Sequence, residues 1–170
     1  MTIIQRYIDL CLLKVSPDSV PASNNLLQLT LFAYFIVGVV ASKVDMSWPM
    51  SIFSSLADMI FMIVALSLLL QFKGLKVRFQ QTLTAMAGAS SCLGIVGLPI
   101  IIWFSQIPEA EQANSYALLF LVILMFWSLM VTSHILRYAL DIKVFAAMVV
   151  TIMYTALSLV VLGLTMSGVA

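Results

Sequence analysis

Five long apolar runs, separated by short polar turns, dominate this sequence and restrict what it can fold into. Hydrophobic residues make up 63% of the chain and charged residues only 9%, against about half and a quarter in soluble domains. A helix needs about 20 predominantly apolar residues to cross a bilayer. We therefore predict an all-α, polytopic membrane protein, with a five-transmembrane-helix bundle over residues 23–170. The predicted spans are residues 26–41, 50–72, 80–103, 116–136 and 144–166.

The third span is unusual because small side chains fill its middle and lie on nearly every face of the predicted helix. Small residues allow helix backbones to approach closely, and this packing drives helix association in membranes. The stretch therefore predicts the central helix of the bundle, with neighbours on more than one side. The predicted packing residues are Ala85, Gly88, Ala89, Ser90, Ser91, Cys92, Gly94, Gly97 and Pro99. We also expect Pro99 to kink or loosen the last turns of the helix.

The N-terminal segment, residues 1–22, predicts a short amphipathic helix. Apolar residues recur at helical spacing, and Pro17 then breaks the pattern. Such a helix can lie in the membrane interface with its polar face toward water. It can also pack against the bundle, and the two interpretations are compatible. Cys11 and Cys92 are expected at different membrane depths, which disfavours a disulfide between them.

Seven of the eight Lys and Arg residues fall on one predicted side of the membrane. They are Arg6, Lys14, Lys73, Lys76, Arg78, Arg137 and Lys143, while Lys43 falls on the other side. Short cytoplasmic loops carry an excess of Lys and Arg. The asymmetry therefore predicts a cytoplasmic N-terminus and a C-terminus on the opposite side. A formal net charge of +1 gives no basis for a nucleic-acid partner.

Asp58 is the one acidic residue within a predicted span. An ionisable group at this depth, about 9–12 Å below the outer surface, is costly unless it is paired, protonated or hydrated. By depth, its candidate neighbours are Tyr34, Ser158 and the carbonyl of Ile95, which Pro99 leaves without its helical donor. The functional interpretation is a proton or cation site. The alternative is a structural hydrogen bond between spans, which the lack of a second embedded carboxylate or cation favours.

Polar and basic residues gather at the predicted cytoplasmic ends of spans three and four. They form a candidate contact for lipid headgroups or a protein partner: Lys73, Lys76, Arg78, Gln80, Gln81, His134 and Arg137. Positive charge at these ends suits anionic lipid and, at Arg137, a helix C-terminus. His134 has no second His and no suitably spaced Cys or Glu, so we predict no metal site.

Two stretches resemble a known family. RFQQTLTAMAGASSCLGIVGLPI is similar to the third-span region of bacterial Yip1-like proteins, and PDSVPASNNLLQLTLFAYFIVG resembles the segment before the first span of short bacterial members. With its five-span plan, the chain therefore resembles the Yip1 family of small integral membrane proteins. The resemblance implies a location in the bacterial inner (cytoplasmic) membrane, with a periplasmic C-terminus, and supplies no catalytic residue.

The sequence offers two functional hypotheses and predicts no enzyme, because it contains no nucleophile–base constellation, phosphate loop or cofactor motif. The first hypothesis is a non-enzymatic scaffold or accessory subunit of a larger membrane assembly. It would act by helix–helix packing with a membrane-protein partner or with a second copy, within the lipid bilayer. The second hypothesis is a small transporter or channel, proton-coupled through Asp58.

Overall fold

The computed structural model describes residues 3–106 and 112–167, and every element in these ranges is helical. Five long helices follow a short N-terminal one, with two 3₁₀ turns in the connections. The elements are α1 (Ile3–Cys11), η1 (Pro17–Ser19), α2 (Asn24–Lys43), α3 (Trp48–Phe72), η2 (Lys76–Arg78), α4 (Phe79–Gln106), α5 (Gln112–Leu140) and α6 (Val144–Ser167).

Five helices are long and apolar enough to cross a membrane, which confirms the predicted all-α polytopic bundle. The helices extend beyond several predicted boundaries. The first of the five long helices, α2, begins at Asn24 and ends at Lys43, whereas the span predicted from the sequence covered only residues 26–41. Polar residues at helix ends remain helical, because their side chains can reach the headgroup region while the backbone continues its hydrogen bonds.

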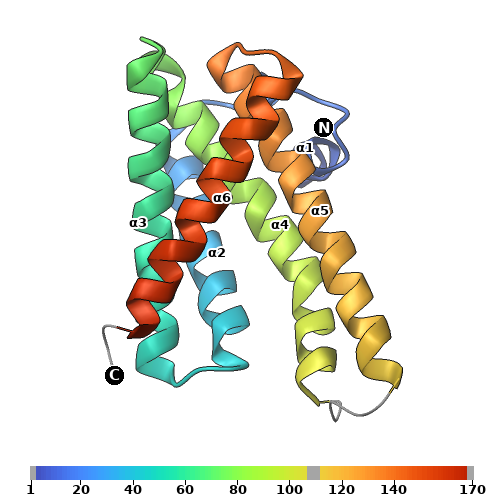
Figure 1. Ribbon diagram of the computed structural model, residues 1–170. Coiled ribbons are helices and arrows are strands. Elements are labelled where there is room, and N and C mark those ends of the chain that lie inside the picture. The colour runs from blue at the N-terminus through green and yellow to red at the C-terminus, as the bar shows by residue number, and fades with distance from the viewer. Residues whose placement is uncertain (1–2, 107–111, 168–170) are drawn as a thin grey trace.

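Helix α4 occupies the centre of the bundle and packs against α1, α2, α3 and α5, while α6 packs against α3 and α5 (Figure 1). Its small residues explain this position. A Cβ atom at Gly88 would lie 2.2 Å from the Tyr7 ring on α1, and one at Gly94 would lie 2.5 Å from Val37 on α2. At Gly97 it would lie 2.8 Å from a Leu124 methyl on α5. Three glycines thus admit three different neighbours, which confirms the prediction of a central helix.

Two residues of the predicted packing set behave differently. Pro99 is exposed, so the prediction that it packs between helices is wrong. Helix α4 also continues through Pro99 to Gln106. Ser90 is half-buried and faces a cavity, whereas its neighbour Ser91 is buried and donates to the carbonyl of Ala87 at 2.7 Å. Ala85, Ala87 and Ala89 are buried in the hydrophobic core, and Cys92 packs against it.

Helix α1 docks on the bundle as well as presenting an apolar face outward. Tyr7, Leu10 and Cys11 are buried against the core, while Ile4 and Ile8 are exposed. Burial, with a smaller effect of Cys92, raises the pKa of Tyr7 to about 12, so this phenol remains neutral. The apolar residues predicted to share one membrane-facing surface are therefore divided between the protein core and the exterior.

The C-terminal end of α1 is fixed by a tight turn and by hydrogen bonds to α5. The turn is a Schellman motif, in which Lys14 N–H donates to the carbonyl of Asp9 and Leu13 adopts a φ of 60°. The indole of Trp127 donates to the carbonyl of Cys11 at 2.8 Å. These contacts place α1 against the interior of the bundle.

The docking of α1 brings the two cysteines together, so the expectation of different depths is wrong. The Cys11 thiol donates to the carbonyl of Ala89 at 3.6 Å. The neighbouring Cys92 side chain, together with burial, raises the pKa of Cys11, and the thiol therefore stays protonated. Both cysteines are free. The error arose because the sequence does not reveal how deeply α1 docks beside α4.

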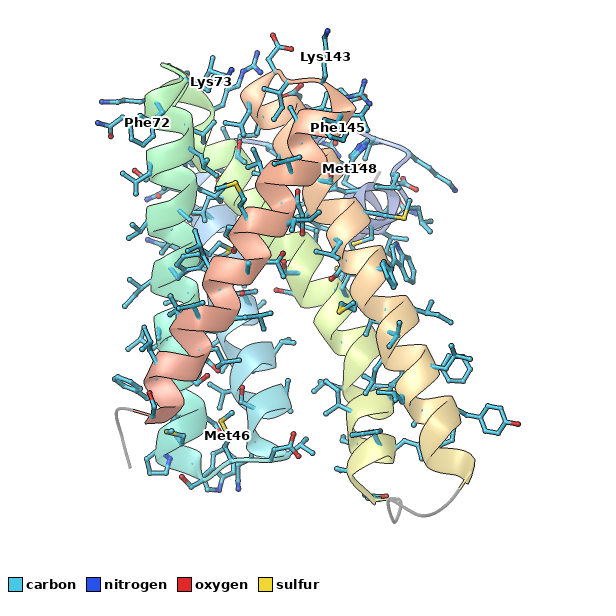
Figure 2. The ribbon with its side chains drawn as sticks, in the orientation of Figure 1. Met46, Phe72, Lys73, Lys143, Phe145 and Met148 are labelled. Carbon is cyan, nitrogen blue, oxygen red and sulfur yellow. The ribbon has the colours of Figure 1, made fainter. Side chains whose placement is uncertain are left out.

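The two ends of the bundle differ in charge. Lys73, after α3, and Lys143, before α6, lie at one end, and Met46 lies at the other (Figure 2). We call the first the cationic end; it also carries Arg78 and Arg137. Lys43 lies at the opposite end, 5.3 Å from the centre of the Trp48 ring. The charge asymmetry expected from the sequence is therefore present along the bundle axis.

Candidate functional site

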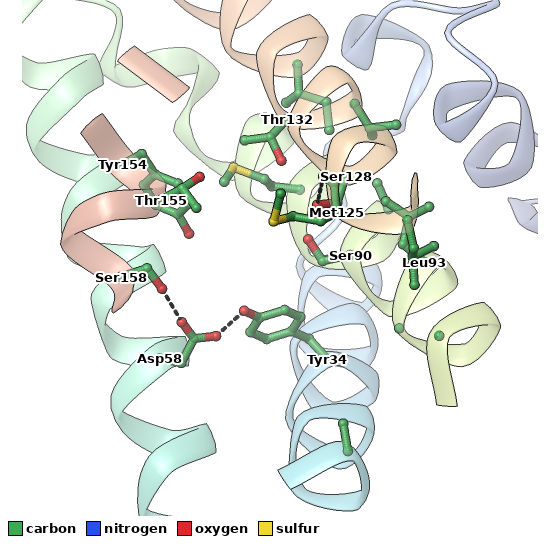
Figure 3. Close-up of a pocket in the computed structure, with 18 of the residues that line it drawn as sticks. Tyr34, Asp58, Ser90, Leu93, Met125, Ser128, Thr132, Tyr154, Thr155 and Ser158 are labelled. Carbon is green, nitrogen blue, oxygen red and sulfur yellow. Dashed lines mark hydrogen bonds between the residues drawn. The ribbon is translucent and has the colours of Figure 1, made fainter. Parts of the chain in front are cut away.

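Asp58 lies near the middle of α3, about 15 Å along the helix from Trp48. Its carboxylate accepts hydrogen bonds from two hydroxyl groups on two other helices (Figure 3). Tyr34 of α2 donates to Oδ2, and Ser158 of α6 donates to Oδ1 at 2.9 Å. The structure thus confirms both side-chain neighbours that the sequence predicted from depth. Three spans that are distant in sequence meet at this carboxylate.

A close approach of α2 and α3 positions Tyr34 against Asp58. One turn further along α2, Gly38 lies so close to α3 that a Cβ atom added to it would be 3.2 Å from Ser55 Oγ. The missing side chain at Gly38 therefore permits the helix spacing that the Tyr34–Asp58 hydrogen bond requires. The Ser55 hydroxyl itself is buried and has no hydrogen-bond partner within the described residues.

The carboxylate lines a cavity of about 440 Å³, bounded by all five long helices. The cavity wall is mostly apolar but carries several hydroxyl groups between the membrane-spanning segments. Besides the Asp58 cluster, hydroxyls come from α4, α5 and α6: Ser90, Ser128, Thr132, Tyr154 and Thr155. Figure 3 shows Ser90, Thr132 and Thr155 around this space. Within the described part of the chain, those three hydroxyls form no hydrogen bond, so they are available to water or a ligand.

A second cavity, of about 290 Å³, extends from the same carboxylate toward the end opposite the cationic end. It shares Tyr34, Asp58 and Ser158 with the first cavity and continues past Ser42 and Ser54. Ser42 lies in the last turn of α2 and Ser54 lies in the second turn of α3, and both turns flank the Met46 loop. Asp58 therefore lies where the two cavities meet, one between the five long helices and one that extends toward the Met46 loop.

Asp58 is the only charged side chain among the described residues that line the two cavities. Neither cavity wall supplies a Lys, Arg or His to balance the charge. The described residues contain no group of three His, Cys, Asp or Glu side chains that could hold a metal ion. The site can accept a proton or a monovalent cation.

The prediction about the Ile95 carbonyl is wrong: no hydrogen bond links it to Asp58 in the described chain. The Ile95 side chain is 58% exposed, and α4 instead turns Ser90 and Gly94 toward the cavity. The helical register explains this difference, because Ser90 and Gly94 are four residues apart and share a face, whereas Ile95 lies about 100° further around the helix.

Sequence reasoning missed the hydroxyls contributed by α5 and, apart from Ser158, those contributed by α6. A signal was present, since Ser128 and Thr132 are four residues apart on α5, and Thr155 and Ser158 are three apart on α6. Pairs at these spacings share one helix face. The spacing predicts a polar stripe, but only the packing shows that both stripes face Asp58.

The predicted headgroup-contact residues divide into two groups. Three of them bind other parts of the chain. Gln81 donates to the carbonyls of Asp18 and Val20, His134 is hydrogen-bonded to the carbonyl of Val15 at 3.0 Å, and Arg78 donates to that of Tyr138. Lys73, Lys76 and Arg137 are exposed at the cationic end, and Gln80 is half-buried. Gln81 and His134 thus hold the segment between α1 and α2 on the bundle.

In comparisons with known proteins, no family model, no curated protein and no solved structure matches the chain. The resemblance to Yip1-like proteins therefore stays a prediction.

Proposed function

We propose that this protein is a small proton-coupled membrane transporter in which Asp58 binds the proton. The observation that supports the proposal is the Asp58 carboxylate, hydrogen-bonded by Tyr34 and Ser158 on the wall of a cavity between the five long helices. An ionisable residue inside a membrane segment that faces a cavity is typical of proton and ion pathways. No basic side chain on the described cavity walls balances the charge, so the carboxylate is available to a proton or a cation.

In this proposal the protein lies in the bacterial inner membrane with its cationic end in the cytoplasm. The N-terminus is then cytoplasmic and the C-terminus periplasmic. The clustering of Lys and Arg at one end supports this orientation. The second cavity, past Ser42 and Ser54, then extends from Asp58 toward the periplasmic side. This geometry favours proton entry from that side.

The scaffold hypothesis and the absence of an enzymatic activity stay predictions from the sequence. One feature behind the scaffold hypothesis is the small-residue central helix, beside short loops and a scarcity of buried charge. In the structure, Gly88, Gly94 and Gly97 are each in contact with another helix of the same chain. These residues therefore no longer favour an external partner, whereas the cavity around Asp58 favours transport.

Proton uptake into liposomes containing the purified protein tests this proposal. A potassium diffusion potential drives the protons, and a trapped pH dye reports their entry. We expect Asp58→Asn to reduce the protein-dependent rate at least tenfold, because the amide cannot bind the proton. Asp58→Glu keeps a carboxylate and should retain measurable uptake.

Asp45→Asn is the matched control, because it makes the same chemical change at an exposed aspartate that lines neither cavity. This variant should behave as the wild type does. Equal proton uptake by the wild type and by Asp58→Asn, with both proteins folded, would contradict the proposal.

A further inference from the structure

The size of the central cavity indicates a ligand larger than a proton. Its volume of about 440 Å³ corresponds to roughly 15 water molecules at about 30 Å³ each. Pockets for small organic molecules have volumes of about 300–1,000 Å³. A proton at Asp58 would leave nearly all of this space to water. The volume therefore indicates an organic molecule that shares the site.

The charge on the walls determines the sign of this ligand. Asp58 is the only charged group on the described walls, so an anion would meet repulsion and no partner. A divalent metal ion is also disfavoured, because Mg²⁺ and Ca²⁺ sites use six or more oxygen ligands, usually with more than one carboxylate or bound phosphate. A single carboxylate suits a monovalent organic cation.

Two tyrosine side chains line the same cavity as the carboxylate and strengthen this assignment. Tyr34 donates to Asp58, and Tyr154 of α6 lines the same cavity one helical turn from Ser158. The Tyr154 ring is stacked on Phe61 of α3, with the ring centres 5.4 Å apart, which restrains its orientation. Aromatic faces attract organic cations, and quaternary ammonium groups in particular are bound by such rings.

The remainder of the cavity is apolar. Leu93 and Ile101 of α4 line it with Leu121, Leu124 and Met125 of α5. Met125 is 49% exposed and lines the cavity, and its flexible thioether can adapt to ligands of different shape. A ligand that fits therefore has a cationic head near Asp58 and an apolar body along α4 and α5.

From these features we infer, resting on the function proposed above, that the cavity binds an organic ammonium ion with an apolar body. The ammonium group lies beside the Asp58 carboxylate, between Tyr34 and Tyr154. A proton and the ammonium ion then compete for one carboxylate. This competition couples the release of one to the binding of the other.

Benzyltrimethylammonium is a suitable probe, because its charge does not change with pH. We expect saturable binding to the purified full chain in detergent micelles, measured by calorimetry, and at least tenfold weaker binding to Asp58→Asn. Asp45→Asn should bind as the wild type does. Tetramethylammonium lacks the apolar body and should bind at least tenfold more weakly than the benzyl compound.

A ligand-side control avoids dependence on any variant. Neopentylbenzene has the shape of the probe, with carbon in place of the charged nitrogen, and should compete at least tenfold less well at matched free concentration. Equal affinity for the charged and neutral compounds, or the lack of saturable binding to the wild type, would overturn the inference.

The pH dependence of binding gives a further test. The titratable groups that face Asp58 from the packed helices are Tyr34 of α2 and Tyr154 of α6, and the described cavity faces of α4 and α5 carry none. Because protonation removes the negative charge of Asp58, acidification should weaken probe binding to the wild type. Equal weakening of probe binding to the wild type and to Asp58→Asn on acidification would overturn the competition between proton and ammonium ion.

The two proposals fail separately. Asp58-dependent proton uptake without probe binding would refute the ammonium ligand and leave the proton-coupled function in place. Probe binding that depends on Asp58, without proton uptake even when the liposomes contain the probe, would refute proton coupling and leave the ligand class.

Discussion

Two regions of α4 show how one helix can serve both packing and binding. Toward the cationic end, Ala85 and Ala87 are 0% exposed, and the Tyr7 ring lies directly on Gly88. Toward the opposite end, Ser90 and Gly94 face a cavity that holds a carboxylate. The residues are small in both regions, but one region is filled by neighbouring side chains and the other is left open.

The difference comes from what the neighbouring helices contribute. Beside Gly88, α1 inserts a tyrosine ring, and large side chains such as Leu10 and Leu83 fill the adjoining core. Beside Ser90, α2, α3 and α6 contribute mainly hydroxyls and Asp58. A run of small residues therefore predicts close approach of helices, and the partner side chains decide whether the approach seals a core or lines a cavity.

The largest expected effect is at Leu10, in the filled region. Leu10 is 0% exposed, and Leu10→Ala should lower the free energy of unfolding by about 2–3 kcal/mol. This value is at the lower end for buried leucines, because detergent or lipid solvates the side chain in the unfolded state. Titration with a denaturing detergent measures the change.

Leu12→Ala is the matched control on the same turn of chain, because Leu12 is 45% exposed. Its effect should stay below about 0.5 kcal/mol. If the two variants were equally stable, α1 would not be part of the packed core.

The contact between Gly88 and Tyr7 gives the next largest effect. Gly88→Ala places a methyl group 2.2 Å from the ring, so the ring or α1 must move. We expect the free energy of unfolding to fall by about 1–2 kcal/mol, as in other overpacked cores. Thermal unfolding followed by circular dichroism reports the loss.

Gly163→Ala makes the same change on α6, where nothing lies within 4 Å of the new methyl group. It should be neutral or slightly stabilising, since Ala favours helix over Gly. A further variant, Tyr7→Ala, should remove most of the cost of Gly88→Ala. Additive effects of the two changes would show that the clash does not account for the destabilisation.

The sequence was sufficient to predict most of the architecture, because hydropathy and charge report the surroundings of a whole helix. Five spans, a central small-residue helix and the neighbours Tyr34 and Ser158 of Asp58 all followed from length, composition and depth. Depth is predictable because each residue advances a helix by about 1.5 Å along its axis.

Rotation and docking were not predictable in the same way. The orientation of Ile95 away from Asp58 depends on how α4 is rotated, and side-chain spacing within α4 does not define that rotation. The proximity of Cys11 and Cys92 depends on the docking of α1. Trp127 and His134 fix this docking through hydrogen bonds to the backbone carbonyls of Cys11 and Val15. Carbonyl acceptors occur at every residue, so such contacts leave no pattern in the sequence.

Ser90 and Ser91 offer the finest test of the comparison, because they are adjacent and differ only in the side of α4 that they occupy. Ser91 is buried and bonded to the carbonyl of Ala87, whereas Ser90 is half-buried and faces the cavity. Ser91→Val should lower the free energy of unfolding by about 1 kcal/mol through overpacking, and Ser90→Val should change it by less than about 0.5 kcal/mol. The same denaturing-detergent titration measures both.

Ligand binding should show the opposite order. Ser90→Val narrows the cavity and removes a free hydroxyl, so benzyltrimethylammonium should bind several-fold more weakly, while Ser91→Val should bind it as the wild type does. A variant pair that lost stability and binding in parallel would show that the two faces of α4 are not separate. A general loss of structure would lower the free energy of unfolding and the probe affinity together. If Ser91→Val affects mainly stability and Ser90→Val mainly binding, packing and binding depend on different sides of the same turn of α4.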